Sequence, residues 1–527
     1  MPHAEPGISF NFAHAILSLN QERAQKTAYI DDTQTLTYGE LDLRVRQFAA
    51  ALLGLGMRRE ERILLIMQDT VDLPVALLGA MFAGIVPVPV NTLLPAADYA
   101  YMLEHCGARM VVASEALWPV VEEALASVAL QQTVKRQTMP QIILSGDGSI
   151  TVPGATRLSH LLETPPLATD DYAHTLADDF AFWLYSSGST GRPKGTVHSH
   201  ANLHWTAELY GKPILGLRES DLVFSAAKLF FAYGLGNGLT FPLSVGATTI
   251  LMAERPTPHA VFKRLVQHQP TVFYGVPTLY VAMLESPELP AKKQVALRIC
   301  TSAGEALSKE VGEKFQRHFG CHILDGLGST EMLHIFLSNR ADDVHYGSTG
   351  LPVPGYTLEL RDELGKPVPA GEIGDLYIRG PSAALLYWSN REKSRGTFVG
   401  DWVKSGDKYS IDAQGYYVYA GRSDDMLKVS GQYVSPIEVE SVLMGHEAVL
   451  ECAVIGMPDA DGLTKTKAFI VLKKPELACD ALADDLKKFV KTRLAPHKYP
   501  REIHFIDQLP KTATGKIQRF KLRAAQA

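Results

Sequence analysis

The chain has 527 residues and a formal net charge of -6, with 46% hydrophobic and 20% charged residues. This length exceeds what one hydrophobic core supports, and it predicts about three or four compact units. The composition is ordinary for a globular protein, and the net negative charge excludes the basic surface that is typical of nucleic-acid binding.

The cysteines and the N-terminus indicate the compartment. Five cysteines are scattered along the chain without a C-x-x-C pair, which indicates reduced core thiols in an intracellular protein. The first ten residues, MPHAEPGISF, lack the basic and apolar regions of a signal peptide. We therefore expect a cytoplasmic protein with no nucleic-acid partner and no membrane attachment, and a homodimer stays open.

Helix and strand patterns alternate in the first part of the chain. Residues 38–56 carry apolar residues at helical spacing, and 62–67 and 108–114 are short apolar stretches typical of strands. The uncharged stretch 73–90 is long enough for a membrane span, but its first half fits a short buried helix and IVPVPV fits a strand. Residues 131–170 are polar and rich in Pro, Gly and Ser, so we expect a surface loop there. The alternation predicts a mostly parallel sheet covered by helices.

The stretch YSSGSTGRPKG, residues 185–195, is predicted to join two strands, because FAFWLY precedes it and TVHSH follows it. It does not match the G-x-x-x-x-G-K-[ST] pattern of a P-loop. Its glycines allow backbone N–H groups to converge on an anion, and its hydroxyls and cations add donors. We favour phosphate binding over the alternative, a flexible surface hairpin. The contributing residues would be Ser186, Ser187, Gly188, Ser189, Thr190, Gly191, Arg192, Lys194 and Gly195.

The alternation of helix and strand patterns resumes through residues 248–331, and the composition of the sequence changes after it. From 345 to 420, Gly and Pro are frequent and the apolar stretches are short, which predicts a small antiparallel, β-barrel-like unit. Residues 435–438 form a capping box with proline at the first helical position, and 481–494 are amphipathic. The stretch 421–431 has glycines at both ends and charge between them, as a hinge would.

The predicted fold is α/β. A large N-terminal domain, residues 1–423, would hold helix-covered, mostly parallel sheets and the β unit. A small, mobile α+β C-terminal domain, residues 424–527, would follow.

Five motifs occur in order along the chain: YSSGSTGRPKG (185–195), GSTE (328–331), KSGD (404–407), GRSDDMLKVSG (421–431) and PKTATGKIQR (510–519). Together they closely resemble the adenylate-forming superfamily of acyl- and aryl-CoA ligases, carrier-protein adenylation domains and luciferases, over nearly the whole chain. Within it, KLFFAYGLGNG (228–238) and GSTEMLHIF (328–336) are most similar to the benzoate–CoA ligase branch.

The GSTE motif suits a metal carried by ATP. A carboxylate, Glu331, follows a hydroxyl, Thr330, after a glycine-rich turn, and such oxygen donors suit Mg²⁺. The resemblance adds Thr190 as a second metal residue and implies that both Glu331 and Thr190 are catalytic. The alternative is a helix N-terminus capped by Ser329 or Thr330. Leu327 stands where many relatives have a tyrosine that stacks on adenine.

The resemblance also assigns the nucleoside. Residues on the adenine side would be Ala303, Gly304, Glu305, Asp325 and Gly326, with Asp325 near the purine amino group. SAGEAL ends an apparent strand, where open α/β sheets bind ligands; the alternative is an ordinary strand-to-helix turn. Asp407 and Arg422 would bind the ribose hydroxyls, and the alternative is a surface turn with a solvated arginine.

Lys516 is implied to reach the forming adenylate on a moving domain, with Asp424 as the hinge. The alternative is one more solvated cation in a basic tail. His198, His200 and His204 form H-x-H-x₃-H, but no cysteine or carboxylate completes a metal set, and we expect no metal there.

KLFFAYGLGNG combines aromatic and small residues, which predicts a flat slot for an aryl ring or, alternatively, an aromatic strand in the core. By resemblance the pocket would be lined by Ala232, Tyr233, Gly234, Gly328, His334 and Ile335, with Lys428 near the carboxylate or the pantetheine arm. A mostly apolar slot favours unsubstituted benzoate.

The implied activity is the ATP-dependent joining of benzoate to coenzyme A through benzoyl-adenylate, which releases AMP and pyrophosphate and uses Mg²⁺. One alternative is an aryl-adenylating enzyme that takes a hydroxy- or aminobenzoate or loads a carrier protein. Another is a non-catalytic nucleotide-binding protein.

Overall fold

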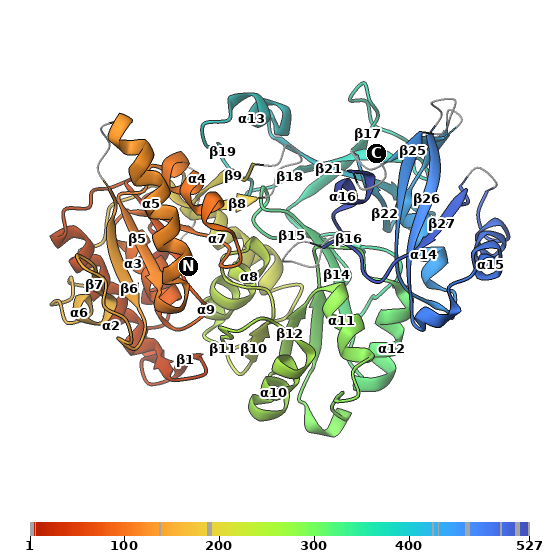
Figure 1. The fold of residues 1–527 in the computed structure, drawn as a ribbon. Helices are drawn as coiled ribbons and strands as arrows, with labels where there is room; N and C mark the ends of the chain where they lie inside the picture. The colour runs from red at the N-terminus through yellow and green to blue at the C-terminus, as the bar shows by residue number, and fades with distance from the viewer. Residues whose placement is uncertain are drawn as a thin grey trace.

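The structure is a computed structural model that describes residues 5, 7–135, 139–186, 192–423, 426–429, 432–458, 464–495, 498–511 and 517–524. Figure 1 shows the N-terminal elements at the left, the middle of the chain at the centre, and the C-terminal elements at the right. The predicted α/β class is confirmed, because parallel sheets with covering helices form the larger part of the molecule.

A parallel sheet with the order β4-β3-β5-β6-β7 lies near the N-terminus. Its strands are β3 (Arg62–Ile66), β4 (Val86–Pro89), β5 (Met110–Ser114), β6 (Gln141–Ser145) and β7 (Thr156–Arg157). Its helices are α2 (Tyr38–Gly54), α3 (Asp72–Phe82), α4 (Ala96–Cys106), α5 (Trp118–Lys135) and α6 (Leu158–Leu161). The uncharged stretch 73–90 forms α3 and β4, as predicted, and both are buried almost throughout.

The prediction of a surface loop over 131–170 is wrong. Helix α5 continues to Lys135, and β6 and β7 add to the parallel sheet. The physical reason is that β6 is a short apolar run, QIILS, whose Ile143 and Leu144 are buried and which pairs with β5 on one side and β7 on the other.

A long mixed sheet forms the middle of the molecule, with the order β16-β15-β14-β13-β12-β10-β11-β1-β2. Its strands are β1 (Thr27–Ile30), β2 (Thr35–Thr37), β10 (Leu222–Ser225), β11 (Thr248–Ile250), β12 (Val272–Gly275), β13 (Ile299–Ser302), β14 (Ile323–Gly328), β15 (Ile335–Ser338) and β16 (Leu351–Pro352). The strands from β1 to β14 in this order pair in parallel, and β2, β15 and β16 extend the two edges antiparallel. Helices α10 (Pro258–His268), α11 (Pro277–Leu284) and α12 (Lys309–Phe319) accompany the parallel part.

The glycine-rich stretch joins two antiparallel strands, as predicted. These are β8 (Phe180–Ser186) and β9 (Lys194–Ser199), and β19 (Leu386–Tyr387) pairs with the other side of β9. Helices α1 (Phe12–Ser18), α7 (His200–Thr206), α8 (Ala232–Leu235) and α9 (Phe241–Val245) complete this region.

The antiparallel unit predicted over 345–420 is also present. Its strands are β17 (Thr357–Arg361), β18 (Gly374–Arg379), β20 (Phe398–Val399), β21 (Trp402–Ile411) and β22 (Tyr417–Arg422), with α13 (Arg391–Thr397) beside β20. β21 pairs with β22, which brings residues 407 and 422 opposite each other.

The C-terminal part has its own hydrophobic core. Its elements are β23 (Leu427–Val429), β24 (Gln432–Val434), α14 (Pro436–Met444), β25 (Val449–Pro458), β26 (Thr464–Leu472), α15 (Asp480–Lys491), β27 (Glu502–Phe505) and α16 (Arg519–Ala524). The Ser435 side chain caps α14 by accepting from the N–H of Glu438. The Glu438 carboxylate accepts from Lys498 at 2.6 and 2.7 Å.

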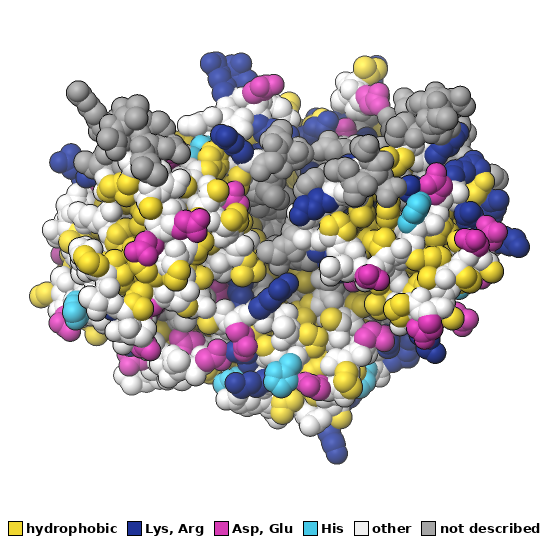
Figure 2. Space-filling model, in the orientation of Figure 1, with side chains coloured by type: hydrophobic (Ala, Val, Ile, Leu, Met, Phe, Trp, Pro, Cys, Tyr) yellow, Lys and Arg dark blue, Asp and Glu magenta, His cyan; other side chains and the backbone are white. Residues whose placement is uncertain are grey.

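On the face shown in Figure 2, Lys and Arg side chains are interspersed with Asp and Glu side chains. Within the described ranges, none of the helices combines the length and the hydrophobicity that a membrane span requires.

Candidate active site

The carboxyl ends of β13 and β14 bring the predicted adenine-side residues together. Ser302 on β13 is the register partner of Asp325 on β14, and residues 303–305 follow directly on β13. Gly304 has φ of +98°, which favours glycine. The predicted location at a strand end is therefore confirmed.

Asp325 is 6% exposed, and its Oδ1 has no hydrogen-bond partner among the described residues. Burial raises the pKa of this carboxyl well above its ordinary range. A buried polar atom without a partner is costly, so the geometry favours a ligand group as the missing partner.

Thr330 and Glu331 lie in the turn between β14 and the antiparallel β15, which we call the β14–β15 turn (residues 329–334). The alternative of a capped helix N-terminus is therefore wrong. The buried His198 side chain contacts this turn: its Nε2 lies 2.8 Å from the Thr330 carbonyl oxygen. Burial lowers the pKa of His198 to about 4, so the imidazole is neutral and donates through Nε2.

Two histidines of the H-x-H-x₃-H pattern, His198 and His200, contact other protein groups. Asn202 Nδ2 lies 2.9 Å from His198 Nδ1, and the N–H of Phe12 donates to His200 Nδ1 at 3.2 Å. Within the described part of the chain, no group of three His, Cys, Asp or Glu side chains is arranged to hold a metal.

Lys194 and Glu331 face each other across the strand and the turn. Lys194 Nζ lies 3.8 Å from Glu331 Oε1, and both side chains are largely buried. Tyr387 lies between them: its hydroxyl donates to Glu331 Oε1 at 2.7 Å and lies 3.3 Å from Lys194 Nζ. Burial lowers the Lys194 pKa, whereas for Glu331 the burial that would raise the pKa is outweighed by Lys194 and Tyr387, which leave it lowered. The sequence analysis missed Tyr387, since a single tyrosine in LLYW carries no signal of its own.

Asp407 and Arg422 form an ion pair at the β21–β22 edge. Arg422 Nη1 donates to Asp407 Oδ1 at 2.9 Å, with the Asp407 side chain 9% and the Arg422 side chain 48% exposed. Gly406 has φ of +78°, and a Cβ there would lie 3.0 Å from Arg422 Nη2. Glycine at 406 therefore leaves room for the guanidinium beside the carboxylate.

Several predicted residues lie outside the described residues: Ser187, Gly188, Ser189, Thr190, Gly191, Asp424 and Lys516. Lys428 lies in β23. Ser186 ends β8, and its buried Oγ has no hydrogen-bond partner within the described ranges.

The acyl loop, residues 228–238, is helical from Ala232, so the alternative of an aromatic strand is wrong. The Tyr233 hydroxyl is hydrogen-bonded to Thr301 Oγ1 at 2.5 Å. His334 Nε2 lies 3.1 Å from Asn237 Oδ1, and burial lowers the His334 pKa to about 3. The turn and the loop therefore meet through His334.

Glycines and aliphatic side chains form the rest of this meeting point. A Cβ at Gly234 would collide with the carbonyl oxygen of Lys228, and a Cβ at Gly328 would lie 2.8 Å from the His334 carbonyl. Ile335 is 1% exposed. Close backbone approach thus fixes the shape of this region.

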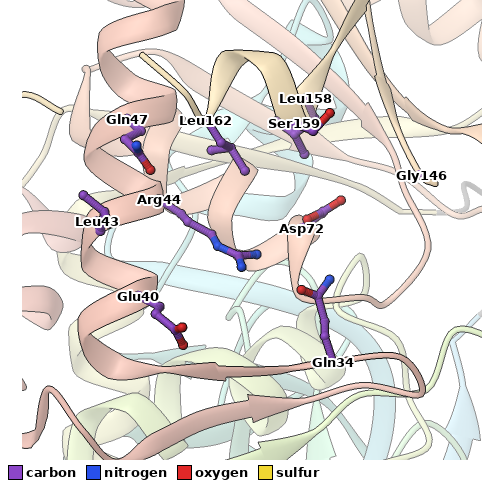
Figure 3. A pocket seen from close by; sticks show the side chains of 10 residues that line it. All are labelled: Gln34, Glu40, Leu43, Arg44, Gln47, Asp72, Gly146, Leu158, Ser159 and Leu162. Carbon is purple, nitrogen blue, oxygen red and sulfur yellow. The ribbon is translucent and has the colours of Figure 1, made fainter. Parts of the chain in front are cut away.

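A surface cavity of about 470 Å³ lies elsewhere, between α2, α3 and α6. Figure 3 shows the Arg44 guanidinium pointing into it between Glu40 and Asp72. It contains none of the predicted site residues, and its opposed charges favour no ligand of a single charge sign.

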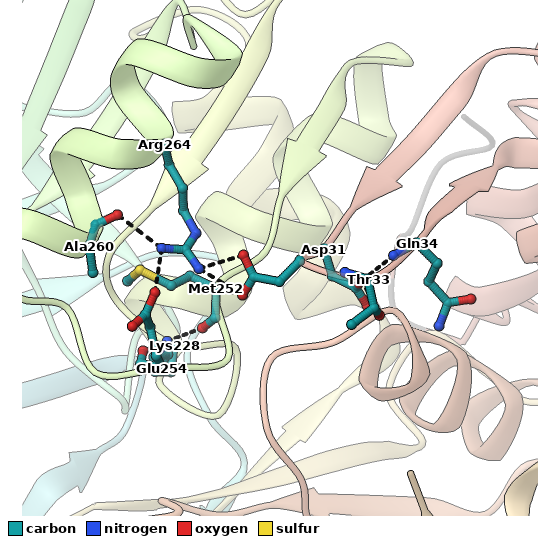
Figure 4. A network of polar contacts seen from close by, with 9 residues as sticks. Asp31, Thr33, Gln34, Lys228, Met252, Glu254, Ala260 and Arg264 are labelled. Atoms are coloured by element: carbon teal, nitrogen blue, oxygen red, sulfur yellow. Dashed lines mark hydrogen bonds and ion pairs between the residues drawn. The ribbon is translucent and has the colours of Figure 1, made fainter. Parts of the chain in front are cut away.

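A charged network around the buried Arg264 side chain lies at the base of the acyl loop (Figure 4). Lys228 Nζ donates to the carbonyl oxygens of Met252 and Glu254, the latter at 2.7 Å. Arg264 is 1% exposed and donates to Glu254 Oε1 at 2.8 Å and to both oxygens of Asp32 at 2.6 and 2.7 Å. The turn after β1 and the segment after β11 are thereby tied to the loop.

Asp69, in the segment between β3 and α3, also contacts the acyl loop. Its carboxylate accepts from the N–H of Leu229 at 3.1 and 3.3 Å, and it is 4% exposed. Burial raises its pKa to about 6 although Lys228 lowers it. No motif had indicated Asp69 or Arg264.

Comparison with known proteins gives matches along nearly all of the chain. The model of the AMP-binding enzyme family matches residues 18–388, and that of the AMP-binding enzyme C-terminal domain matches residues 438–516. A benzoate–CoA ligase of Thauera aromatica is 58% identical over 505 residues, which are 95% of this chain and 93% of that protein.

Two further proteins extend the comparison. A 4-hydroxybenzoate–CoA/benzoate–CoA ligase of Rhodopseudomonas palustris is 48% identical over 508 residues, 95% of this chain and 91% of that protein. The crystal structure of a benzoate CoA ligase from Burkholderia xenovorans LB400 matches with a TM-score of 0.90 and 64% identity, covering 98% of this chain and 100% of that one.

Proposed function

The chain belongs to the AMP-binding enzyme family, as its ordered motifs predicted, and from this premise we propose that it converts benzoate, ATP and coenzyme A to benzoyl-CoA, AMP and pyrophosphate. The observation that carries the proposal is the 58% identity to a benzoate–CoA ligase over 95% of the chain. The paired charges around the β14–β15 turn support it, since adenylation needs donors and cations where phosphate charge develops.

The nucleotide would lie along the carboxyl ends of β13 and β14. The buried, unpartnered Oδ1 of Asp325 supports a role at the purine amino group: a protonated carboxyl also keeps an acceptor oxygen for that donor. Ala303, Gly304 and Glu305 would line the base. Gly326 would lie beside Asp325.

Asp407 and Arg422 would take the ribose. A carboxylate can accept from both sugar hydroxyls, and the guanidinium 2.9 Å away holds it in place. Lys194 and residues 186–191 would bind the β- and γ-phosphates, which leave as pyrophosphate.

The donor set of the turn fits Mg²⁺. The Glu331 pKa is lowered, so the carboxylate is charged at neutral pH, and oxygen donors are what this ion prefers. Glu331 and Thr190 would hold it with the nucleotide. Bound there, Mg²⁺ would neutralise charge on the phosphates.

The chemistry would proceed in two half-reactions. A carboxylate oxygen of benzoate attacks the α-phosphorus of ATP, the bond from that phosphorus to the bridging oxygen breaks, and pyrophosphate leaves. The CoA thiolate then attacks the carbonyl carbon, and AMP leaves with the electron pair of the broken C–O bond. Lys516 would pair with the acid and the α-phosphate in the first half-reaction. The domain 424–527 would then rotate about Asp424, with Lys428 near the carboxylate or the pantetheine arm.

The ring would lie between the acyl loop and the turn, against Ala232, Tyr233, Gly234, Gly328, His334 and Ile335. A second candidate is a ring-hydroxylated benzoate. The buried Nδ1 of His334 has no hydrogen-bond partner among the described residues, and a ring hydroxyl would supply one. The relative named for both 4-hydroxybenzoate and benzoate supports testing it.

The test is a panel of aromatic and aliphatic acids assayed for AMP release that needs both ATP and CoA. We expect benzoate to give the highest kcat/KM, and a holo carrier protein to fail as acceptor in place of CoA. A preference for an aliphatic acid, or acyl transfer to the carrier protein alone, would contradict the proposal.

The division between half-reactions is tested with Lys516→Ala. We expect loss of benzoate-dependent ATP–pyrophosphate exchange, with thioester formation from supplied benzoyl-AMP retained. Equal losses in both assays would refute a role for Lys516 confined to adenylation.

A further inference from the structure

The segment 382–388 lies between two parts of the candidate nucleotide site. On one side it is hydrogen-bonded to β9, the strand that begins with Lys194: the N–H of Leu385 donates to the Val197 carbonyl at 2.9 Å, and the N–H of Trp388 donates to the Gly195 carbonyl at 2.8 Å. The register sets Tyr387 opposite Thr196. This pairing fixes the direction of the Tyr387 side chain relative to the strand.

On its other side the same segment is bonded to the β14–β15 turn. The N–H of Ala384 donates to the Glu331 carbonyl at 2.7 Å, and Ser382 Oγ donates to the Met332 carbonyl at 2.8 Å. One short segment therefore ties the strand that carries the cation to the turn that carries the carboxylate.

The Tyr387 side chain completes this connection. It is 3% exposed, and its hydroxyl donates to Glu331 Oε1 at 2.7 Å. The Lys194 ammonium lies 3.3 Å from the same hydroxyl and 4.4 Å from the ring centroid. Lys194 and Glu331 are 3.8 Å apart, beyond the usual length of a charged hydrogen bond, so the phenol supplies the short contact that the two charges do not make with each other.

We propose that Tyr387 is a positioning residue that orients the Glu331 carboxylate for the metal–nucleotide complex. The inference rests on the proposed function and extends it to a residue that no motif indicated. A phenol suits this place because its hydroxyl donates to the carboxylate while its ring faces the cation.

Tyr387→Phe tests this role, because it keeps the ring and removes the donor. We expect the affinity for ATP with Mn²⁺, measured by calorimetry and by the electron paramagnetic resonance of the bound ion, to fall about tenfold, as for one hydrogen bond to a charged group. The affinities for metal-free ATP and for benzoate should stay within about twofold, since neither depends on the orientation of Glu331.

The matched control is Tyr29→Phe. Tyr29 is 0% exposed, lies on β1, and its hydroxyl has no hydrogen-bond partner in the described part of the chain. We expect it to leave metal–nucleotide affinity unchanged. A general effect of deleting a buried tyrosine hydroxyl would appear in both variants and would overturn the inference.

A double-mutant cycle of Tyr387→Phe with Glu331→Gln separates positioning from packing. If Tyr387 acts through Glu331, the double variant should bind Mn²⁺–ATP no more weakly than Glu331→Gln alone. Additive losses, or an equal loss of metal-free ATP and benzoate affinity in Tyr387→Phe, would show that the role is structural. Because these are binding measurements, they remain decisive even if benzoate proves not to be the preferred acid.

Discussion

On the predicted nucleotide side of the candidate site, charged side chains come together from separate strands, whereas on the predicted acyl side the charges lie at the base of the loop 228–238. Lys194, Glu331, Asp407 and Arg422 are brought together by strand pairing and one turn. The acyl loop meets the turn through glycines and a neutral histidine, and Arg264 and its partners support it from behind. We therefore expect electrostatics to determine nucleotide binding and backbone shape to determine the choice of acid.

This contrast predicts two classes of variant. A change on the nucleotide side should weaken the reaction for every acid to the same extent, and a change on the acyl side should alter the ranking of acids while ATP affinity is kept.

The largest effect is expected for Glu331→Gln. Glutamine keeps an oxygen that can accept from the Tyr387 hydroxyl, but it removes the negative charge opposite Lys194 and the anionic ligand that suits Mg²⁺. We expect ATP–pyrophosphate exchange to fall about a thousandfold, in the range of a lost group that stabilises transition-state charge. The ranking of acids should be unchanged. A changed ranking would show that the turn also selects the acid.

A smaller effect, on the acyl side, is expected for Gly234→Ala. The new Cβ would collide with the Lys228 carbonyl, so the loop must shift. We expect kcat/KM for benzoate to fall about a hundredfold, with ATP affinity retained, as for an overpacked site. Gly396→Ala in α13 is the control, because a Cβ there meets nothing within 4 Å. Equal losses for all acids in Gly234→Ala would contradict the separation.

Asp407→Asn should reduce activity less than the two variants above, and its effect should depend on the ribose of the nucleotide. The wild-type enzyme should prefer ATP over 2′-deoxy-ATP, because the carboxylate would accept from the ribose hydroxyls. We expect the variant to raise the KM for ATP about tenfold and to lose most of that preference. If both proteins discriminate the two nucleotides equally, Asp407 does not bind the 2′-hydroxyl.

A further effect is on stability, and both regions share it. The pKa of His198 is lowered to about 4 and that of His334 to about 3, in each case first by burial, from an ordinary value of 6.5. Unfolding lets these imidazoles bind protons, so their contribution is present above pH 6.5 and is lost as the pH falls toward the folded values. The free energy of unfolding should fall by about 1.4 kcal/mol per pH unit for each histidine.

Urea titrations at pH 7.5, 6.5 and 5.5 measure this slope. His198→Gln should reduce it, whereas His160→Asn, on the surface, should leave it unchanged. An unaltered slope in His198→Gln would mean that this histidine is not neutral in the folded protein.

The contrast between the two regions also explains how far sequence reasoning could reach. That Asp407 and Arg422 lie close together was predictable, because each residue stands in a motif and both were assigned to one ribose; their ion pair is seen only in the structure. Tyr387 was not, because its partner Lys194 is 193 residues away and nothing local marks it. Asp69 lies 160 residues from Leu229, from whose N–H it accepts, and Arg264 lies 232 residues from Asp32. The error over 131–170 came from a short strand hidden among polar residues.

The support of the acyl loop by Asp32, Asp69, Glu254 and Arg264 has a consequence for engineering. Exchanging only the side chains that contact the ring would leave the new pocket residues on a loop whose position is still set by the original contacts. A chimaera that accepts a bulkier acid would need these distant positions to be carried over together with the loop, as one inherited unit.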